Sequence, residues 1–196
     1  MNARRRVVPF AAMFFVATNA NARPVIKKPG AHPEYVVELE PHFLLDWADI
    51  PGPNGEGLGV GLRVSIPLLH NGPIDTINNN MAIGFGMDWA HRRRDCRHRD
   101  PWWDDCRVDS LRFPIVLQWN FFLTDMISDF GEPGLAVVHH RWETWDHCPE
   151  LDPCTATRTD VRPVFWGGAR FLFTDTVGVT VRIGHPSLSA GVSLLF

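Results

Sequence analysis

Apolar and polar residues alternate along most of this chain with a period of two, and the last ten residues show the pattern most regularly. Every second residue from Leu188 to Phe196 is apolar, whereas the residues between them are mostly serine and glycine. Because successive side chains of a β-strand point to opposite sides, this alternation predicts a strand with one apolar and one polar face. The strand is expected to run to the final residue, Phe196.

The same period of two predicts seven more strands, separated by segments rich in Gly, Pro, Asn and Asp. We expect eight strands of roughly 9 to 13 residues, at positions 35–47, 58–66, 81–89, 111–123, 134–142, 165–173, 177–184 and 187–196. Within the fifth strand, Ala136-Val137-Val138-His139-His140 follows neither phase of the alternation, which predicts a bulge there. Two long polar loops are expected, at 90–109 and 143–160.

The first 22 residues have the three parts of a secretory signal peptide. Arg4-Arg5-Arg6 is a basic start, residues 7–17 form an apolar core, and Ala20-Asn21-Ala22 is a cleavage site of small residues. We therefore expect a signal peptide at 1–22, a flexible periplasmic leader at 23–34 and a barrel at 35–196. Cleavage removes three arginines and takes the formal net charge from −3 to −6, and neither value argues for nucleic-acid binding.

Two kinds of all-β protein fit this pattern, a soluble protein and a barrel that spans a membrane. A β-protein in lipid must be a closed barrel, because only closure satisfies every backbone polar group. In a transmembrane barrel the apolar face is outside, whereas in a soluble lipocalin-like carrier it lines the interior. Lys is absent after Lys28, although a water-exposed β-surface usually carries many. The apolar face also carries aromatic residues near strand ends, as interfacial girdles do: Tyr35, Trp47, Trp89, Trp119, Phe173 and Phe196. We therefore favour an eight-stranded antiparallel up-and-down transmembrane β-barrel, with the lipocalin-like carrier as the remote alternative.

The signal peptide, the eight alternating strands, the long loops and the terminal Phe196 together resemble the small OmpA/OmpX-type outer-membrane barrels of Gram-negative bacteria. The resemblance implies location in the bacterial outer membrane, in contact with its lipid and lipopolysaccharide. It also implies that both long loops are extracellular and that the assembly machinery reads the C-terminal strand with Phe196 as a signal.

Four cysteines form two local pairs, one in each long loop: Cys96 with Cys106, and Cys148 with Cys154. An exported protein enters an oxidising compartment, so each pair is expected to form a disulfide. The alternative is metal binding together with nearby histidines, but the spacing contains no CxxC pair. We expect disulfides, no metal and no cofactor.

The loop at 90–109 mixes arginines, acids and tryptophans. One interpretation is a surface that binds lipopolysaccharide phosphates or an acidic partner, through Arg92, Arg93, Arg94, Arg97, Arg99, Trp102 and Trp103. The other is a solvated loop whose arginines pair with its own acids and with those of the loop at 143–160. The interspersed acids argue against nucleic acid.

The polar faces of the predicted strands carry charges of both signs. We expect these to meet in the lumen as a charge network of Glu38, Glu40, His42, Asp46, Arg63, Asp88, Arg112, Arg170 and Arg182. A histidine beside carboxylates also suits acid–base catalysis, and some small outer-membrane barrels modify lipid A. No nucleophile motif accompanies this histidine, however, so we expect no catalytic residue. A lumen filled by side chains leaves no wide channel.

These expectations favour a non-enzymatic outer-membrane barrel that displays two disulfide-pinned loops for surface interaction or envelope integrity. An enzyme that modifies lipid A or phospholipid and a narrow solute channel are the alternatives.

Overall fold

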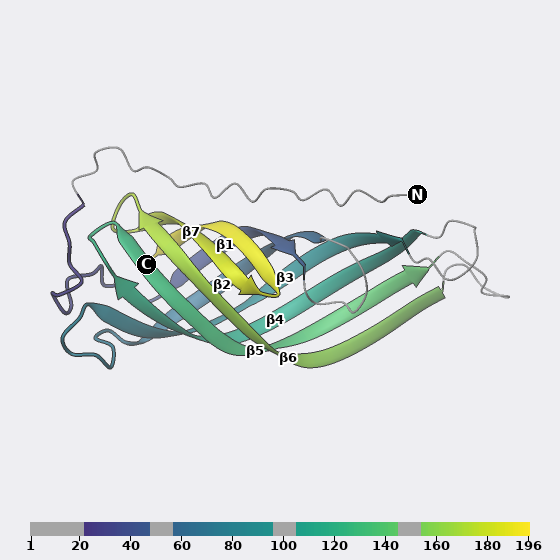
Figure 1. Ribbon diagram of the computed structural model, residues 1–196, viewed down its shortest axis with the longest axis horizontal. Helices are drawn as coiled ribbons and strands as arrows, with labels where there is room; N and C mark the ends of the chain where they lie inside the picture. Colours follow the sequence, from purple (N-terminus) through teal and green to yellow (C-terminus); the bar gives the residue numbers. More distant parts are fainter. Residues whose placement is uncertain (1–21, 48–56, 96–104, 145–153) are drawn as a thin grey trace, which may run out of the picture.

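The computed structural model describes residues 22–47, 57–95, 105–144 and 154–196. Eight antiparallel strands close into a barrel in chain order (Figure 1), which confirms the predicted fold. They are β1 (Glu38–Asp46), β2 (Gly57–Leu69), β3 (Asn79–Asp95), β4 (Asp105–Phe122), β5 (Ile127–Thr144), β6 (Cys154–Leu172), β7 (Val177–His185) and β8 (Ser187–Leu195). These ranges contain no helix that is long and apolar enough to cross a membrane.

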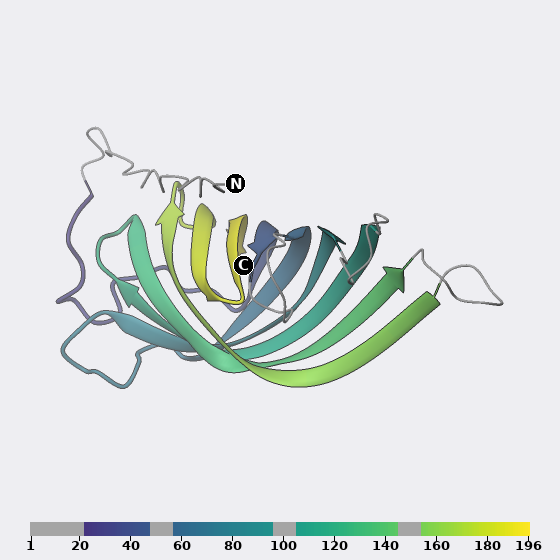
Figure 2. The same cartoon turned by 45° about the vertical axis from the view of Figure 1, so that its right-hand side comes forward.

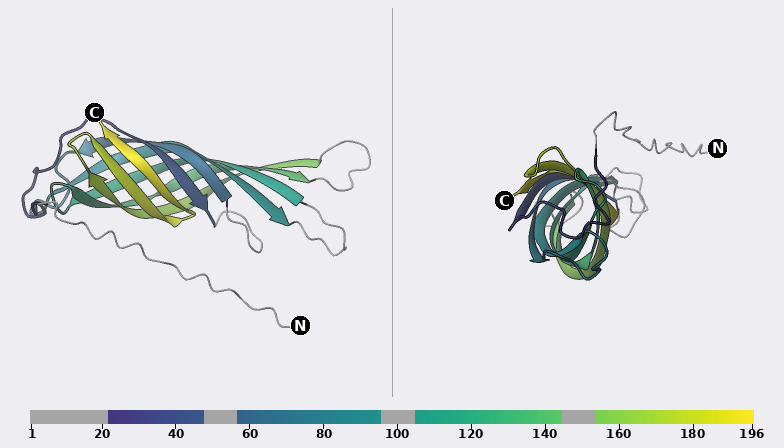
Figure 3. Two further views of the ribbon diagram at one scale, coloured as in Figure 1. Left: turned by 90° about the horizontal axis from the view of Figure 1, so that it is seen from above. Right: turned by 90° about the vertical axis from the view of Figure 1, so that its left-hand side faces the viewer.

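The strands are steeply tilted around the barrel (Figure 3). A row of paired residues starts at His42 of β1 and passes through β2, β3, β4 and β5 to reach β6 at Asp160. In the other direction, the row passes from His42 through β8 and β7 and reaches β6 at Arg170. These two positions are ten residues apart, so the strands are staggered by ten residues over one circuit. Strand number and stagger together set the width of a barrel, and eight strands enclose a space that side chains can fill.

Strand lengths differ strongly around the barrel. β1, β7 and β8 each have 9 residues, whereas β3, β4, β5 and β6 have 17, 18, 18 and 19. The four long strands continue past the others at one end of the molecule (Figure 2). The predicted range of 9 to 13 residues was therefore wrong for these four.

Every described residue of the two predicted long loops lies in a strand. The β3–β4 ladder continues from the Ala90–Ser110 pair to the Asp95–Asp105 pair, and the β5–β6 ladder continues to the Thr144–Cys154 pair. The prediction failed here because the hydrophobic alternation stops where the strands leave the apolar part of the wall. Charged and polar residues on both faces of a strand give no period to read.

The fifth strand was the least regular part of the sequence. β5 pairs with β6 from Ile127 to Thr144, and its described ladder shows no register shift, so the predicted bulge is wrong. Ala136 and Val138 face inward while Leu135 and Val137 face outward, so both faces are apolar and the alternation disappears. An irregularity lies instead between Pro67 and Leu69, where β2 pairs with β3.

The apolar face points outward and the polar face inward, as a transmembrane barrel requires and a lipocalin-like carrier does not. Phe43 is 76% exposed, Ile115 60% and Phe165 58%, whereas Arg112 and Arg182 are each 1% exposed. Tyr35 departs from the predicted aromatic girdle, because it is buried with Leu172 and Leu195 at the end of the barrel. It precedes β1, so its side chain does not follow the alternation of that strand.

The segment before β1 packs against the same end of the barrel, where the short connections lie (Figure 1). The backbone of Val25 donates to the carbonyl oxygen of Leu123 over 3.0 Å, and the backbone of Asn78 donates to Ile26 over 2.7 Å. His32 stacks on Phe122 with 4.4 Å between ring centroids. These contacts were not foreseen for a segment expected to be a flexible leader.

Candidate functional site

The interior of the barrel gathers charged side chains from β1 to β7. All are buried, because each occupies an inward position of a regular strand. We call this set the charge network: the carboxylates are Glu38, Glu40, Asp46, Asp88 and Glu132, the guanidinium groups are Arg63, Arg92, Arg112, Arg170 and Arg182, and His42 is the imidazole. Its five acids and five arginines balance, which matters because an unpaired charge in the interior is costly.

One half of the charge network surrounds Asp46 and Asp88. Arg112 reaches both, with Nη2 2.8 Å from Asp46 Oδ2 and Nη1 3.7 Å from Asp88 Oδ2. Arg92 lies 3.5 Å from Asp46 and also donates to its backbone carbonyl over 3.1 Å. Arg63 approaches Asp88 to 3.6 Å. Side chains from β1, β2, β3 and β4 are thereby tied together.

The other half is centred on Arg182. Its guanidinium bonds to Glu132, with 2.9 Å from Nε to Oε2, and also to Glu40. Arg63 lies 3.7 Å from Glu132 and 3.6 Å from Asp88, so it links the two halves. Arg170 and Glu38 form a separate pair at 2.6 Å. The network therefore spans the interior from Asp46 near the end of β1 to Glu40 near its start.

Apolar and aromatic side chains fill the space beside these charges. Trp166 is 1% exposed and packs in a cluster with Val116, Ala136, Val138 and Val164. The guanidinium carbon of Arg63 lies 5.0 Å from the centroid of the Trp166 ring, which is a cation–π geometry. Arg182 stands in the same way over Phe130, also at 5.0 Å. The described interior is thus packed with side chains of both kinds.

His42 is the one imidazole of the charge network. Its Nε2 lies 3.0 Å from Asp88 Oδ1, and its Nδ1 lies 3.2 Å from the backbone carbonyl oxygen of Glu40. Both ring nitrogens therefore have acceptors within the protein. This arrangement holds the ring in place, and it directs neither nitrogen at a substrate as a general base requires.

The structure brings together every residue predicted for the lumen, and it adds Glu132, Arg92 and Trp166. Glu132 was missed because the fifth strand was expected to begin after it. The residues Ser128 to Glu132 show no alternation of apolar and polar side chains that could have extended the predicted strand to include it.

Arg92 was predicted as an extracellular ligand contact, and this was wrong. It is 6% exposed and pairs with Asp46 inside the barrel, because β3 continues through this position and turns it inward. Arg93 and Arg94 lie in β3, opposite Arg107 and Cys106 of β4.

Several predicted residues lie outside the described ranges: Arg97, Arg99, Trp102, Trp103, Cys96 and Cys148. The backbones of Cys106 and Cys154 lie in β4 and β6, at positions paired with Arg94 and Thr144. Among the described residues, no group of three or more His, Cys, Asp or Glu is placed to hold a metal ion.

Beyond the apolar wall, the four long strands continue as one sheet whose described outward side chains are polar. We call it the outer extension and define it as residues 90–95, 105–110, 139–144 and 154–160. On its outward face His91 bonds to Asp109 and His139 to Thr159, each over 2.9 Å. On its inward face Arg158 lies 2.7 Å from Asp160. This sheet offers polar groups to an outside partner at the end of the barrel opposite the leader.

Comparison with known proteins gives similar folds and no similar sequences. No protein-family model matches the chain, and no curated protein matches it. Neisserial surface protein A is similar in structure, with a TM-score of 0.51 at 12% identity over 82% of this chain and 97% of that one. Ail, the attachment invasion locus protein of Yersinia pestis, gives a TM-score of 0.48 at 12% identity over 82% of this chain and 99% of that one. A structure of Ail with the heparin analogue sucrose octasulfate gives 0.46 at 12% identity, over 81% and 96% of the two chains. The chain therefore has the fold of the small eight-stranded outer-membrane barrels.

Proposed function

We propose that this protein is a non-enzymatic outer-membrane barrel that holds the outer extension above the membrane as a surface for ligands. One observation carries the proposal, which is the abrupt change in polarity along the outward face of the four long strands. The last apolar outward residues are Trp89, Leu111, Val137 and Val161. Two positions further along each strand, the outward residues are His91, Asp109, His139 and Thr159.

The lengths of the strands support the same interpretation. A tilted transmembrane strand needs about 9 to 11 residues, and β1, β7 and β8 have 9 each. β3 to β6 have 17 to 19 residues, and the excess corresponds to roughly 20 to 30 Å of extended chain at about 3.3 Å per residue. Strand ladders that continue so far past the apolar wall suit a rigid stalk better than a flexible loop.

The packed interior supports a structural role for the barrel itself. The charge network and the Trp166 cluster occupy the lumen, which opposes the alternative of a solute channel. His42 has both ring nitrogens engaged, which opposes an enzyme built on that residue. The barrel is then an anchor, and the function resides in the outer extension.

For the ligand, we favour an anionic surface such as lipopolysaccharide phosphate. Arg107, Arg141 and Arg158 are exposed on the outer extension, and arginine forms bidentate bonds with phosphate. We keep Arg93, Arg94, Arg97, Arg99, Trp102 and Trp103 as proposed contacts and omit Arg92, because it is buried. Disulfides Cys96–Cys106 and Cys148–Cys154 would pin the two hairpin ends.

Phe196 is proposed as the assembly signal. It is 63% exposed on the outer wall at the end where the leader packs. Its backbone carbonyl accepts from Val36 over 2.6 Å, and its backbone N–H donates to Val37 over 2.9 Å. The end of β8 is therefore ordered by residues that precede β1, while its side chain remains available to a partner.

The test shortens both hairpins at matched pairs of their ladders. Residues 94–106 are replaced by Asn-Gly between Arg93 and Arg107, and residues 142–156 are replaced by Asn-Gly between Arg141 and Thr157, since Asn-Gly favours two-residue hairpins. Both cysteine pairs leave together, so no odd thiol remains. Wild-type and shortened proteins are isolated from the outer-membrane fraction, compared on a denaturing gel with and without boiling, and titrated with lipopolysaccharide.

We expect both proteins to shift on boiling, because the barrel is intact in both. We expect the shortened protein to bind lipopolysaccharide on the order of tenfold more weakly or worse, equivalent to about 1.4 kcal/mol. Equal binding by the two proteins would exclude the hairpin ends at 94–106 and 142–156 from the ligand site, because the shortened protein retains Arg107, Arg141 and Arg158. Recovery of the wild type in the periplasm without a boiling shift would overturn the membrane barrel itself.

A further inference from the structure

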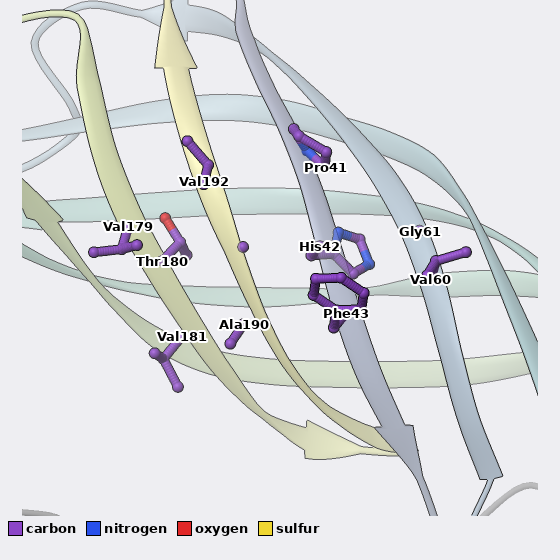
Figure 4. Close-up of a pocket in the computed structure, with 11 residues that line it drawn as sticks. Pro41, His42, Phe43, Val60, Gly61, Val179, Thr180, Val181, Ala190 and Val192 are labelled. Carbon is purple, nitrogen blue, oxygen red and sulfur yellow. The ribbon is translucent and has the colours of Figure 1, made fainter.

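The outer wall of the barrel is hollowed where the first and last strands meet. A groove of about 510 Å³ crosses β7, β8, β1 and β2 (Figure 4). We call it the wall groove. Seven of its 11 lining residues face outward, and all seven are proline, phenylalanine, alanine or valine. The outward-facing lining of the groove therefore consists entirely of hydrocarbon side chains.

The groove exists because small residues gather at the β1–β8 seam. Ala190 of β8 lies in one cross-strand row between Val181 of β7 and Phe43 of β1, so the wall is lowest at its methyl group. The next inward residue, Gly191, has no side chain, and a Cβ there would lie 2.5 Å from the carbonyl oxygen of Pro41. The two backbones thus approach closely, and the larger side chains of β7, β1 and β2 stand up on either side.

The depth of the groove limits what can occupy it. His42 and Gly191 are paired near the middle of β1 and β8, so the groove lies midway along the strands that span the apolar wall. At that level a bilayer offers hydrocarbon chains and no headgroups. The occupant must then be an acyl chain or the apolar wall of another membrane protein.

The size and shape of the groove favour the acyl chain. Stable protein interfaces use about 20–30 residues on each side, whereas 11 residues line this groove. Phe43 is 76% exposed and stands beside the groove. Its ring would keep the flat apolar wall of another membrane protein from contacting the bottom of the groove. A flexible chain can lie beside the ring and gain dispersion contacts along the groove.

We propose that the wall groove is a lipid site that seats one acyl chain of a membrane lipid in preference to the rest of the outer wall. The inference rests on the proposed membrane location of the barrel. It concerns the wall rather than the outer extension, and it predicts an uneven distribution of lipid contacts around the barrel.

The experiment uses the full protein in dimyristoylphosphatidylcholine vesicles that contain a small fraction of phosphatidylcholine with a diazirine at the middle of one acyl chain. After irradiation, lipid adducts are mapped to peptides by mass spectrometry. The groove peptides contain Phe43 and Val181, and the reference peptide on β4 contains Ile115, which is 60% exposed on the outer wall. Ala190→Phe fills the groove, and Val161→Phe adds the same side chain at an exposed outward position of β6 that pairs with Val137 of β5, away from the groove.

We expect more adducts on the groove peptides than on the β4 peptide. Ala190→Phe should reduce the groove adducts on the order of tenfold, corresponding to about 1.4 kcal/mol, and leave the β4 adducts unchanged. Val161→Phe should leave the groove adducts unchanged. Equal labelling of all walls, or no response to Ala190→Phe, would overturn the lipid site but not the membrane location. A second copy seated in the groove would exclude the labelled lipid, and groove adducts below those of the β4 peptide would therefore also overturn it. Failure to label any wall would contradict the proposed function instead.

Discussion

The imidazole of His42 on β1 reaches across Gly61 on β2 to the carboxylate of Asp88 on β3, with 3.0 Å between Nε2 and Oδ1. The three residues lie in one cross-strand row. A side chain at the middle position would stand between the two bonded groups. The pair therefore spans two strand spacings only because the residue between is glycine.

This geometry predicts that Gly61→Ala destabilises the barrel. An added Cβ would lie 2.5 Å from Asp88 Oδ1 and would also clash with His42, so the buried pair must separate or the strands must shift. We expect a loss of roughly 1–3 kcal/mol, the usual cost of overpacking, measured by urea unfolding in detergent micelles.

The matched control is Gly131→Ala on β5, where an added Cβ meets nothing within 4 Å. It should be neutral or slightly stabilising, since alanine restricts the unfolded chain. Equal loss of stability at Gly61 and Gly131 would show that the His42–Asp88 contact is not the cause.

Glu132 lies between two arginines and should be essential to the charge network. Glu132→Gln removes the charge that faces Arg182 at 2.9 Å and Arg63 at 3.7 Å, and it leaves both guanidinium groups buried. Breaking one side of a buried ion pair costs about 3–5 kcal/mol. We expect a loss of that order in the free energy of unfolding, measured in the same way.

Asp129→Asn on the same strand is the control, because Asp129 is exposed on the outward face. Its effect should stay within about 0.5 kcal/mol. If Glu132→Gln is as mild as this control, the interior ion pairs contribute little to stability.

The sequence predicted the strand number, the closure and the outward apolar face because these depend on alternation alone. Residues such as Arg63, Asp88 and Arg182 could be placed inside from their phase within a strand. Their partners could not be predicted, because the contact between Arg182 and Glu132 depends on the stagger of the closed barrel, which the sequence does not display.

The ends of the long strands were beyond the reach of the same reasoning. A strand in water has no apolar face to mark it, so residues 90–95 and 154–160 looked like loop. Arg92 shows the consequence, because it was counted as a surface arginine until the β3 ladder placed it beside Asp46. The leader contacts of His32 with Asn78 and Phe122 were hidden for another reason. His32 and Asn78 lie in irregular segments that have no period, although Phe122 is the last residue of β4.

The cysteine pairs make a prediction that stands apart from the barrel. In the two proposed hairpin ends, Cys96–Cys106 and Cys148–Cys154 should be oxidised, because the exported chain meets an oxidising compartment. Thiol titration of unreduced, denatured protein should find no reactive group, and reduction should release all four cysteines. Four free thiols before reduction would refute both disulfides, and two would refute one of them.

The filled lumen predicts that the protein does not conduct ions. Arg63 lies between Asp88, Glu132 and the ring of Trp166, so the interior is occupied from several strands at one level. In planar bilayers the wild type should show no steady conductance.

Removal of residues 23–34 should leave the protein without conductance, because the obstruction lies in the charge network and not in the leader. Arg63→Ala combined with Trp166→Ala should produce small openings, because it removes both members of the stacked pair. Steady conductance of the wild type would mean that the interior contains a continuous water path, and conductance only after removal of the leader would make that segment the plug.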